Sequence, residues 1–480
     1  MNNDTPAGNS LNNSQLFLDD TLIEDHIRVQ RVWHQPHKYL EPVMKPAYPW
    51  EGWCPCLYGT VLRIDGTFRM WYVGTRNSSK PRACYAESSD GIHWERPELG
   101  ICEYDGSKKN NIIIDPQQNN IPPNGFVPFK DTNPNVRPSE LYKAVGDHRK
   151  HYVLASPDGI HWRLMKEEPI DIVYNTHVRS GNVLPDVDRT PASLAGTDGG
   201  RNVSFYVAFD TMPIVFWDAP RGEYVLYSRA NTTAPRDIWY STSKDFLNWA
   251  EPGLVVHDVA PSTNDQLYNS AIERYGRAPH LFVGFPMRLA GRKARSPDAI
   301  KWGIGEAVFI CSRDGRSFHR YMEPLIRPGR DRRNWAKHSN MIAAGLLRTG
   351  EDEISVYYTR NHYSRVHWLQ RAVFRIDGFV SLRAPYEGGE FTTKPLVFSG
   401  SVLVMNAATG VSGGVRVEVQ DGRGEPLEGY RLEDCVEFYG DEIEEVVRWK
   451  SGADLGALAS HPVRLRFVMR EADLYSLRFR

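Results

Sequence analysis

The stretch Ser88-Ser-Asp90-Gly91-Ile-His-Trp94 decides the fold of this chain, because versions of it return three more times. The four copies start 68, 87 and 69 residues apart. Repetition at the spacing of one small sheet is typical of folds whose similar units pack around or along an axis. The later copies are Ser156-Pro-Asp158-Gly159-Ile-His-Trp162, Ser243-Lys-Asp245-Phe-Leu-Asn-Trp249 and Ser312-Arg-Asp314-Gly315-Arg-Ser-Phe318.

Each copy has the chemistry of a tight turn followed by an aromatic residue. An Asp side chain bonds to the backbone that follows it, and Gly accepts positive φ. The aromatic residue three positions after the Gly position is expected to fold back onto the face of its own unit. We therefore interpret the motif aspartates as structural; they are Asp90, Asp158, Asp245 and Asp314.

Runs rich in β-branched and aromatic residues precede every copy, and turn formers bound them, which is typical of strands. The first copy follows two such runs, at 68–74 and 82–87, and a leading strand at 58–64. About four strands per unit is the composition of a propeller blade. A fifth unit without the motif ends near Ile376. We expect an all-β protein with a five-bladed β-propeller over residues 16–376. A solenoid is the competing arrangement, but four or five long units are few for a solenoid.

The sequence changes character after Asp377-Gly378. Short alternating apolar and polar runs, separated by turn signals such as Asp421-Gly422, favour an antiparallel β-sandwich over residues 377–480. Such a module can bind sugar, but covering the flank of the propeller is its commoner use. Residues 1–15 are polar and Asn-rich, and we expect a disordered tail there.

Composition argues against several partners. The net charge of −1 and the isoelectric point near 7.0 give no long-range attraction to nucleic acid or to an anionic membrane. No apolar stretch approaches the ~20 residues of a membrane span. The first residues do not read as a secretory signal, and the six cysteines lack disulfide or zinc spacing. We expect reduced thiols and a cytoplasmic protein, or a secreted one if a signal was removed.

The polar residues of the innermost strands are the candidates for chemistry, because those strands reach the propeller axis. The first three blades each offer one carboxylate there: Glu51, Asp131 and Asp210. Carboxylates that converge in a poorly solvated pocket raise each other's pKa. One protonated acid beside ionised partners is what glycosidic cleavage requires. Each residue also has an ordinary alternative: a surface position for Glu51, an Asx-turn for Asp131 and a turn cap for Asp210.

Further residues are candidates for binding substrate. Trp50 and Trp53 flank Glu51 and would offer an aromatic platform to a sugar ring. The fourth and fifth blades offer neutral polar groups and a histidine, although a satisfied structural histidine is the commoner case. Glu306 is a rival carboxylate on a strand away from the axis. The binding candidates are Trp50, Trp53, Tyr268, Asn269, Arg288 and His338, with Arg360 and His362 as further rim positions.

The five-blade layout, the Ser-x-Asp-Gly-x-x-Trp motif and the trailing β domain resemble the five-bladed propeller glycoside hydrolases. These include the invertase-like family 32, the arabinanase and xylosidase family 43, and families 68, 117 and 130. The resemblance implies one acidic residue from each of the first three blades, lining a funnel. In this sequence it implies Glu51 as base or nucleophile, Asp131 as the orienting residue and Asp210 as general acid, with no metal or other cofactor.

The sequence departs from the family patterns at all three carboxylates. Trp50-Glu51-Gly52 stands where invertase-like enzymes have Trp-x-Asn-Asp-Pro-Asn-Gly. Lys130-Asp131-Thr-Asn-Pro134 only loosely echoes their Arg-Asp-Pro, and Phe209-Asp210-Thr211 replaces their Glu-Cys. These differences indicate a divergent branch, and they affect the roles and the substrate more than the place of the site.

The hypothesis is an exo-acting glycoside hydrolase that releases a terminal sugar, with furanosides such as fructosyl or arabinofuranosyl units favoured. A non-catalytic sugar-binding propeller is one alternative. A glycoside phosphorylase or transglycosidase is another, with Lys130, Arg288, His338 and Arg360 as its basic groups. The insertion at 171–202 is a candidate gate or subunit contact, so a homo-oligomer is a further alternative.

Overall fold

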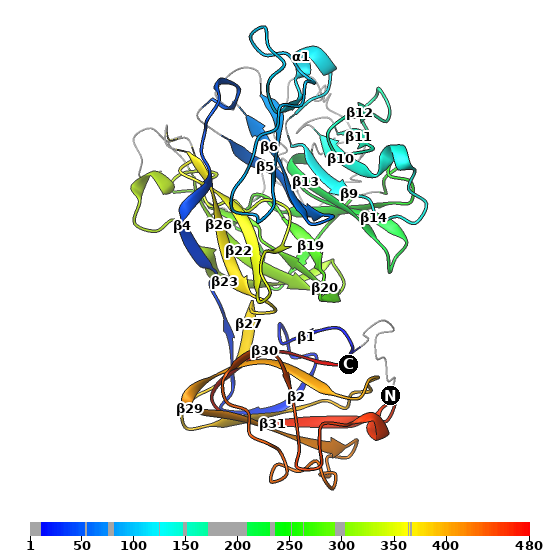
Figure 1. The fold of residues 1–480 in the computed structure, drawn as a ribbon, viewed down its shortest axis with the longest axis vertical. Helices are drawn as coiled ribbons and strands as arrows, with labels where there is room; N and C mark the ends of the chain where they lie inside the picture. The colour runs from blue at the N-terminus through cyan, green and yellow to red at the C-terminus, as the bar shows by residue number, and fades with distance from the viewer. Residues whose placement is uncertain are drawn as a thin grey trace, which may run out of the picture.

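The computed structural model describes residues 11–52, 55–74, 81–123, 125–146, 151–170, 209–230, 236–250, 252–262, 264–292, 303–362, 364 and 367–480. Of residues 209–211 and 230 it describes the backbone alone. Nearly all regular structure in these ranges is β, as the strand pattern predicted, and the one α-helix there is α1 (Pro116–Asn119). None of the helices described is long and apolar enough to cross a membrane. Figure 1 shows the sheets of the repeats above and a C-terminal sheet below.

Four sheets in the repeat region have four antiparallel strands each, so this part of the propeller prediction is confirmed. The N-terminal strand β4 completes the last of them by pairing with β26. The first sheet consists of β5 (Cys56–Ile64), β6 (Thr67–Gly74), β7 (Arg82–Ser88) and β8 (Ile112–Ile114), the second of β9 (Val127–Lys130), β10 (Tyr142–Gly146), β11 (Tyr152–Ser156) and β12 (Arg163–Leu164), the third of β13 (Phe209–Asp218), β14 (Glu223–Ala230), β15 (Ile238–Ser243) and β16 (Gly253–Leu254), and the last of β24 (Leu347–Arg348), β25 (Glu353–Arg360), β26 (Trp368–Arg375) and β4 (His37–Met44).

The fourth repeat differs from the expected four-stranded blade, because its sheet has seven strands. The extra strands come from the segments around its core: β17 joins β23 in parallel, while β18 and β21 attach to β22. The sheet consists of β17 (Val256–His257), β18 (Gln266–Leu267), β19 (Ile272–Tyr275), β20 (Ala278–Gly284), β21 (Met287–Ala290), β22 (Ile304–Ser312) and β23 (Ser317–Ile326).

The inner segments of the sheets surround a common central cavity of about 330 Å³. Its walls come from residues 60 and 62–64, 127–130, 214–217, 271–274 and 344–345, one segment from each repeat. The ring closes where the last repeat meets the first: the Val61 N–H donates to the Ala344 oxygen at 2.9 Å. The sheets are therefore arranged as a ring, in which the first and last repeats of the sequence are neighbours.

The repeated motif forms the same turn in all four copies. In the first, the Ser88 hydroxyl accepts the Gly91 N–H at 2.9 Å, and one Asp90 oxygen accepts the N–H groups of Ile92 and His93 at 2.8 Å. The other three copies repeat these bonds. The four aspartates thus hold turns, as the motif predicts.

These turns also bind the neighbouring sheet, which the sequence did not indicate. The expectation was that the aromatic residue packs on its own unit, and Trp162 does bond back to its own turn at 2.9 Å. Trp94, however, packs edge-on against Tyr357 of the last sheet. Three turn carbonyls accept a hydrogen bond from an aromatic side chain of the preceding sheet: Gly159 from Trp71 at 2.7 Å, Gly315 from Tyr227 at 2.6 Å and Gly91 from Tyr357 at 2.6 Å.

Replacing Gly159 by alanine tests this contact between sheets. Gly159 has a φ of +82°, and a Cβ there would lie 2.9 Å from the Trp71 ring. Gly222 also has positive φ but has no atom within 4 Å of its Cβ position, so Gly222→Ala is the matched control for backbone strain. We expect Gly159→Ala to lower the free energy of unfolding by about 1–3 kcal/mol more than Gly222→Ala, because the added methyl overpacks the contact. Urea titration measures both, and equal losses would contradict the prediction.

The C-terminal part forms one eight-stranded hydrogen-bonded sheet, and the β-sandwich expected there is not seen among its strands. The two longest strands pair on both sides of a break in register between Thr409 and Gly414. A Cβ at Gly413 would lie 2.5 Å from the Glu471 oxygen, so glycine is needed at this break. Side chains from both halves fill one core. The strands are β1 (Gln15–Leu16), β2 (Ile23–Ile27), β3 (Gln30–Trp33), β27 (Val380–Ala384), β28 (Gly389–Thr393), β29 (Leu403–Asp421), β30 (Asp441–Val446) and β31 (Val463–Phe479).

The N-terminal strands belong to this C-terminal sheet. Strands β1, β2 and β3 pair with β31, β28 and β27, and Figure 1 shows them beside the C-terminal strands. The disordered tail expected to reach residue 15 is wrong for its last five residues. Leu11 is buried in the C-terminal core and accepts the Phe479 N–H at 2.8 Å, because the edge of β31 offers it a partner. Residues 1–10 lie outside the described ranges.

Asp377 joins the ring of sheets to the C-terminal sheet. Its buried carboxylate accepts the Tyr275 hydroxyl at 2.5 Å, the Arg277 Nε–H at 3.1 Å and the Ser476 hydroxyl at 2.7 Å. The first two donors belong to the fourth repeat and the third to β31. Asp377 itself has a φ of +58°. One carboxylate therefore connects three segments that are distant in the sequence.

Candidate functional site

Aromatic and basic side chains from several sheets gather near the beginning of the inner strands. We call Tyr58, Arg229, Tyr268, His338 and His362 the axial cluster. The ring centroids of Tyr268 and His338 are 4.5 Å apart, and those of Tyr58 and His338 are 5.8 Å apart. The hydroxyl oxygens of Tyr58 and Tyr268 are 3.4 Å apart. These three residues come from the first, fourth and last repeats, so the ring of sheets brings them together.

Basic groups surround the ring of Tyr268. The Arg229 guanidinium lies 4.0 Å from the ring centroid and the Lys337 ammonium lies 5.8 Å from it. Arg229 is buried near the end of β14 and is paired in register with Asp210 of β13. A cation at this distance from an aromatic face is electrostatically favourable. The cluster therefore combines flat apolar faces with charged hydrogen-bond donors.

A further histidine, His367, extends the cluster through His362. The ring centroid of His362 is 5.1 Å from that of His338, and His367 follows at another 5.1 Å. The Nε2 atom of His362 is 3.5 Å from the Cys56 sulfur. Among the residues that the structure describes, no group of three or more His, Cys, Asp or Glu is arranged to hold a metal ion.

Backbone strain is concentrated around the cluster. His338 has a φ of +65° and Met212, in the bulged part of β13, has a φ of +53°. Non-glycine residues in this region cost about 1–3 kcal/mol each and persist where the surroundings hold them. Asn269 supplies such a hold: its oxygen accepts the Met287 N–H at 2.7 Å and its amide donates to the Ile342 oxygen at 3.2 Å. Asn269, predicted to bind substrate, is therefore engaged within the protein.

Glu51 is buried in the short helix η1 (Pro49–Glu51), and its carboxylate is fully engaged. One oxygen accepts the Tyr72 hydroxyl and the Arg96 Nε–H, each at 2.6 Å. The other accepts the N–H groups of Ala47 and Tyr48 at 2.8 and 3.2 Å. Burial, with the nearby Cys84 and Glu51, holds the pKa of Tyr72 well above its usual value, so its hydroxyl stays a donor. This carboxylate ties the entry of the first repeat to its sheet.

Trp50 is partly buried and packs against aromatic residues of the protein. Its ring stacks on Tyr48 with centroids 4.6 Å apart and planes 4° apart, and its Nε1–H donates to Asn111 at 2.8 Å. Tyr104 packs edge-on against the same ring. Trp53, the second predicted platform residue, lies outside the described residues.

Asp131 lies at the other end of its inner strand from the axial cluster. It follows β9, whose residues line the central cavity, whereas Asp210 and His338 precede the cavity-lining residues of their repeats. Its buried carboxylate accepts the Lys143 ammonium and the Tyr224 hydroxyl, both at 2.7 Å, and the Asn133 N–H at 2.9 Å. Asp131 is therefore not brought together with Asp210, whereas the carboxylate of Glu51 is engaged by groups of the protein.

The backbone of Asp210 lies at the cluster, because Asp210 is paired in register with Arg229. It is the second residue of β13, and the register of β13 against β14 shifts between Asp210 and Ile214. Its side chain and the insertion at 171–202 lie outside what the structure describes. Arg288 is instead paired with Glu306 at 2.7 Å on the fourth sheet. Tyr58 and Arg229 were not among the residues predicted from the sequence to belong to the site. The position of Tyr58 at the start of the predicted leading strand could have indicated it.

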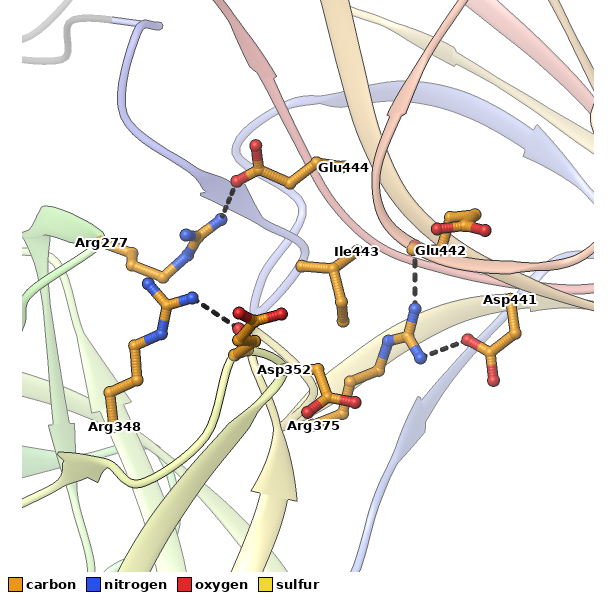
Figure 2. Close-up of a pocket in the computed structure, with 9 residues that line it drawn as sticks. Arg277, Arg348, Asp352, Arg375, Asp441, Glu442, Ile443 and Glu444 are labelled. Atoms are coloured by element: carbon orange, nitrogen blue, oxygen red, sulfur yellow. Dashed lines mark hydrogen bonds and ion pairs between the residues drawn. The ribbon is translucent and has the colours of Figure 1, made fainter. Parts of the chain in front are cut away.

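A larger pocket of about 650 Å³ lies between the ring of sheets and the C-terminal sheet (Figure 2). Its charged groups largely engage one another. Arg375 pairs with Asp441 and donates to the Glu442 oxygen, and Arg277 lies 3.5 Å from Glu444. We therefore place the candidate site at the axial cluster, where rings and cations from several sheets face one another.

No protein-family model matches the chain. Two curated Mycobacterium tuberculosis proteins, described as uncharacterized protein Rv1502 and uncharacterized protein MT1551, are 30% and 29% identical to it over 137 residues. The match covers 26% of this chain and 36% of each relative. The chain thus spans about a third of the length of the curated relatives it matches.

Several solved structures are similar in part. An N-acetylgalactosamine deacetylase from F. plautii in complex with blood group B trisaccharide has a TM-score of 0.41 and 15% identity, covering 77% of this chain and 97% of that one. A glycosyl hydrolase from Bacteroides ovatus has a TM-score of 0.41 and 13% identity, covering 72% and 94%. A thermostable family-43 glycoside hydrolase has a TM-score of 0.41 and 13% identity, covering 68% and 92%. These likenesses are weak and assign no activity to this chain.

Proposed function

We propose that this protein is a carbohydrate-active enzyme, a glycoside hydrolase whose site is the axial cluster. The observation that supports this best is the gathering of Tyr58, Tyr268 and His338, with Arg229, at one end of the ring of sheets. Aromatic faces pack against the C–H faces of sugar rings, while imidazole and guanidinium groups donate to hydroxyls. A largely apolar site with a few placed polar groups is typical of small-molecule binding.

Asp210 is our proposed general acid, because it begins β13 beside Arg229 at this end of the ring. We propose that Glu51 and Asp131 support the site's framework, since every oxygen of both carboxylates already accepts a donor of the protein. Exo action on a terminal sugar, with furanosides favoured, rests on the sequence resemblance and is part of the proposal.

Phosphorolysis is the second candidate, favoured by the basic character of the cluster. A phosphate pocket needs two or three cationic donors, and Arg229 and Lys337 both lie over the ring of Tyr268. Of the basic groups named from the sequence, only His338 belongs to the cluster. Lys130 lines the central cavity, Arg288 pairs with Glu306, and Arg360 donates to Gln370.

The test is turnover of aryl furanosides and pyranosides of both anomers by wild type and by Asp210→Asn, with and without phosphate. We expect at least a hundredfold loss of kcat in the variant, because general acid catalysis contributes about 10²–10⁴-fold. Asp434→Asn, a change in the C-terminal part, is the matched control and keeps its activity. A strict need for phosphate would establish the phosphorylase. Sugar binding on a glycan array without turnover would instead indicate a binding protein.

A further inference from the structure

The central cavity lies along the axis of the ring of sheets, beyond the axial cluster. Its walls include residues 60 and 62–64 of β5 and 214–217 of β13, which come later in their strands than Tyr58 and Asp210. The walls are mostly apolar. A volume of about 330 Å³ can hold a small ligand with several waters, since one water occupies ≈ 30 Å³ in the liquid.

Among the described residues that line this cavity, Glu273 of β19 is the only carboxylate. Its carboxyl group lies near the backbone N–H groups of Gly345 and Leu346 from the last repeat. Gly345 has a φ of +109°, and a Cβ there would lie 1.9 Å from the Val61 oxygen, so only glycine allows this approach. The side chain keeps some accessible surface because it faces the cavity. It nevertheless lies deep enough that burial raises its pKa to about 8.

The other charged residues that line this cavity are cationic. Arg63 of β5 and Lys130 of β9 line the same cavity, and both side chains are exposed. Arg63 donates to the Arg348 oxygen, and within the described ranges neither Arg63 nor Lys130 forms an ion pair. Arg274 is instead occupied, because two of its nitrogens bind the Asp218 carboxylate at 2.8 and 2.9 Å. The segments 214–217 and 344–345 contribute no charged residue.

We propose that the central cavity binds a small oxyanion, a carboxylate or a phosphate, between the cations of Arg63 and Lys130 and the carboxyl group of Glu273. A protonated carboxyl group has an O–H to donate. The anion supplies the acceptor for that O–H and the counter-charge for two cations. This site is separate from the axial cluster and does not depend on the proposed function.

The proposed site is proton-dependent. Below the pKa of Glu273 the carboxyl is neutral and donates to the anion, whereas above it the carboxylate repels the anion. The affinity is therefore full at low pH and is lost as the pH rises through about 8. Between about pH 6.5 and about pH 9.5 the protonated fraction falls about thirtyfold, and the affinity is expected to fall with it.

The experiment is a calorimetric titration of the intact protein with sodium acetate at constant ionic strength, at both pH values. Acetate is the probe because its own charge is constant over this range. We expect one saturable site whose affinity falls about thirtyfold at the higher pH. Glu273→Gln keeps the binding and loses the pH dependence, because its amide is neutral at both values. Repeating the titration with sodium phosphate distinguishes a carboxylate from a phosphate as the preferred anion.

Lys130→Ala is expected to lower the affinity for acetate at least tenfold. Lys166→Ala is the matched control, because Lys166 is exposed and lies outside the cavity lining. Circular dichroism checks that each variant is folded. Absence of saturable binding at the lower pH overturns the proposal, and so does binding that is indifferent to Lys130 or, in wild type, to pH. The wild-type pH comparison remains decisive if a variant does not fold. Loss of turnover on glycosides has no bearing on this result.

Discussion

Asp377→Ala is expected to lower the free energy of unfolding by about 3–5 kcal/mol, because removing one member of a buried ionic network leaves its partners uncompensated. Arg277 loses its buried acceptor, and the hydroxyls of Tyr275 and Ser476 lose theirs. Burial, together with the charge of Asp377, holds the pKa of Tyr275 well above its usual value, so its hydroxyl is always a donor in need of an acceptor.

The control for Asp377→Ala must separate backbone strain from the lost network. Asp65 has a φ of +50° and is exposed in the turn between β5 and β6. Asp65→Ala therefore reports the cost of alanine in the left-handed region, about 1–2 kcal/mol. Urea unfolding followed by fluorescence and circular dichroism measures both variants. If Asp377→Ala costs no more than Asp65→Ala, the carboxylate does not hold the two sheets together.

Asp131→Ala is the second large effect, again about 3–5 kcal/mol, because it leaves the buried ammonium of Lys143 without its carboxylate. Asp131→Leu combined with Lys143→Met removes both charges. That double variant is expected to recover at least half of the loss, since replacing a buried ion pair by apolar residues is often close to neutral.

The double variant also separates the two interpretations of Asp131. A structural carboxylate predicts that turnover per folded molecule is retained once stability is restored. A catalytic or orienting carboxylate predicts that kcat stays low in the stable double variant. Kinetics with the best substrate from the glycoside panel, normalised to the folded fraction, decide between them.

The repeat architecture was predictable because its signal is local. The Ser-x-Asp turn needs only a few consecutive residues, so each copy marked a unit wherever it occurred. The strands around it also matched: the runs expected at 68–74 and 82–87 are β6 and β7. The seven strands of the fourth sheet were not predictable, because β18 is a two-residue strand that pairs beyond its own hairpin.

The candidate site was predictable only in part, because an inner strand has two ends. Asp131 and Asp210 both adjoin an inner strand, but one follows it and the other begins it, and the residue types alone do not distinguish these positions. The sugar platform predicted beside Glu51 differs from the structure for another reason. The neighbouring Trp50 suggested a sugar platform, yet the stacking partner is Tyr48 of the same loop. The alternating pattern after residue 377 was also ambiguous, since one bent sheet and a pair of sheets share it.

The pairing of the two ends of the sequence has a consequence for biosynthesis. Gln15 pairs with Leu477, and His37 of β4 pairs with Val373 of β26. A ribosome that adds roughly 5–20 residues per second releases the first strands roughly 20–90 seconds before the last partner strand emerges. Until then β1 has no partner strand, while β4, β3 and β2 wait for β26, β27 and β28, and the open backbone edges of these strands are exposed to other chains. The nascent protein is thus expected to depend on chaperones until β31 is made, and a ribosome stalled before β31 would hold a polypeptide whose strand β1 is still unpaired.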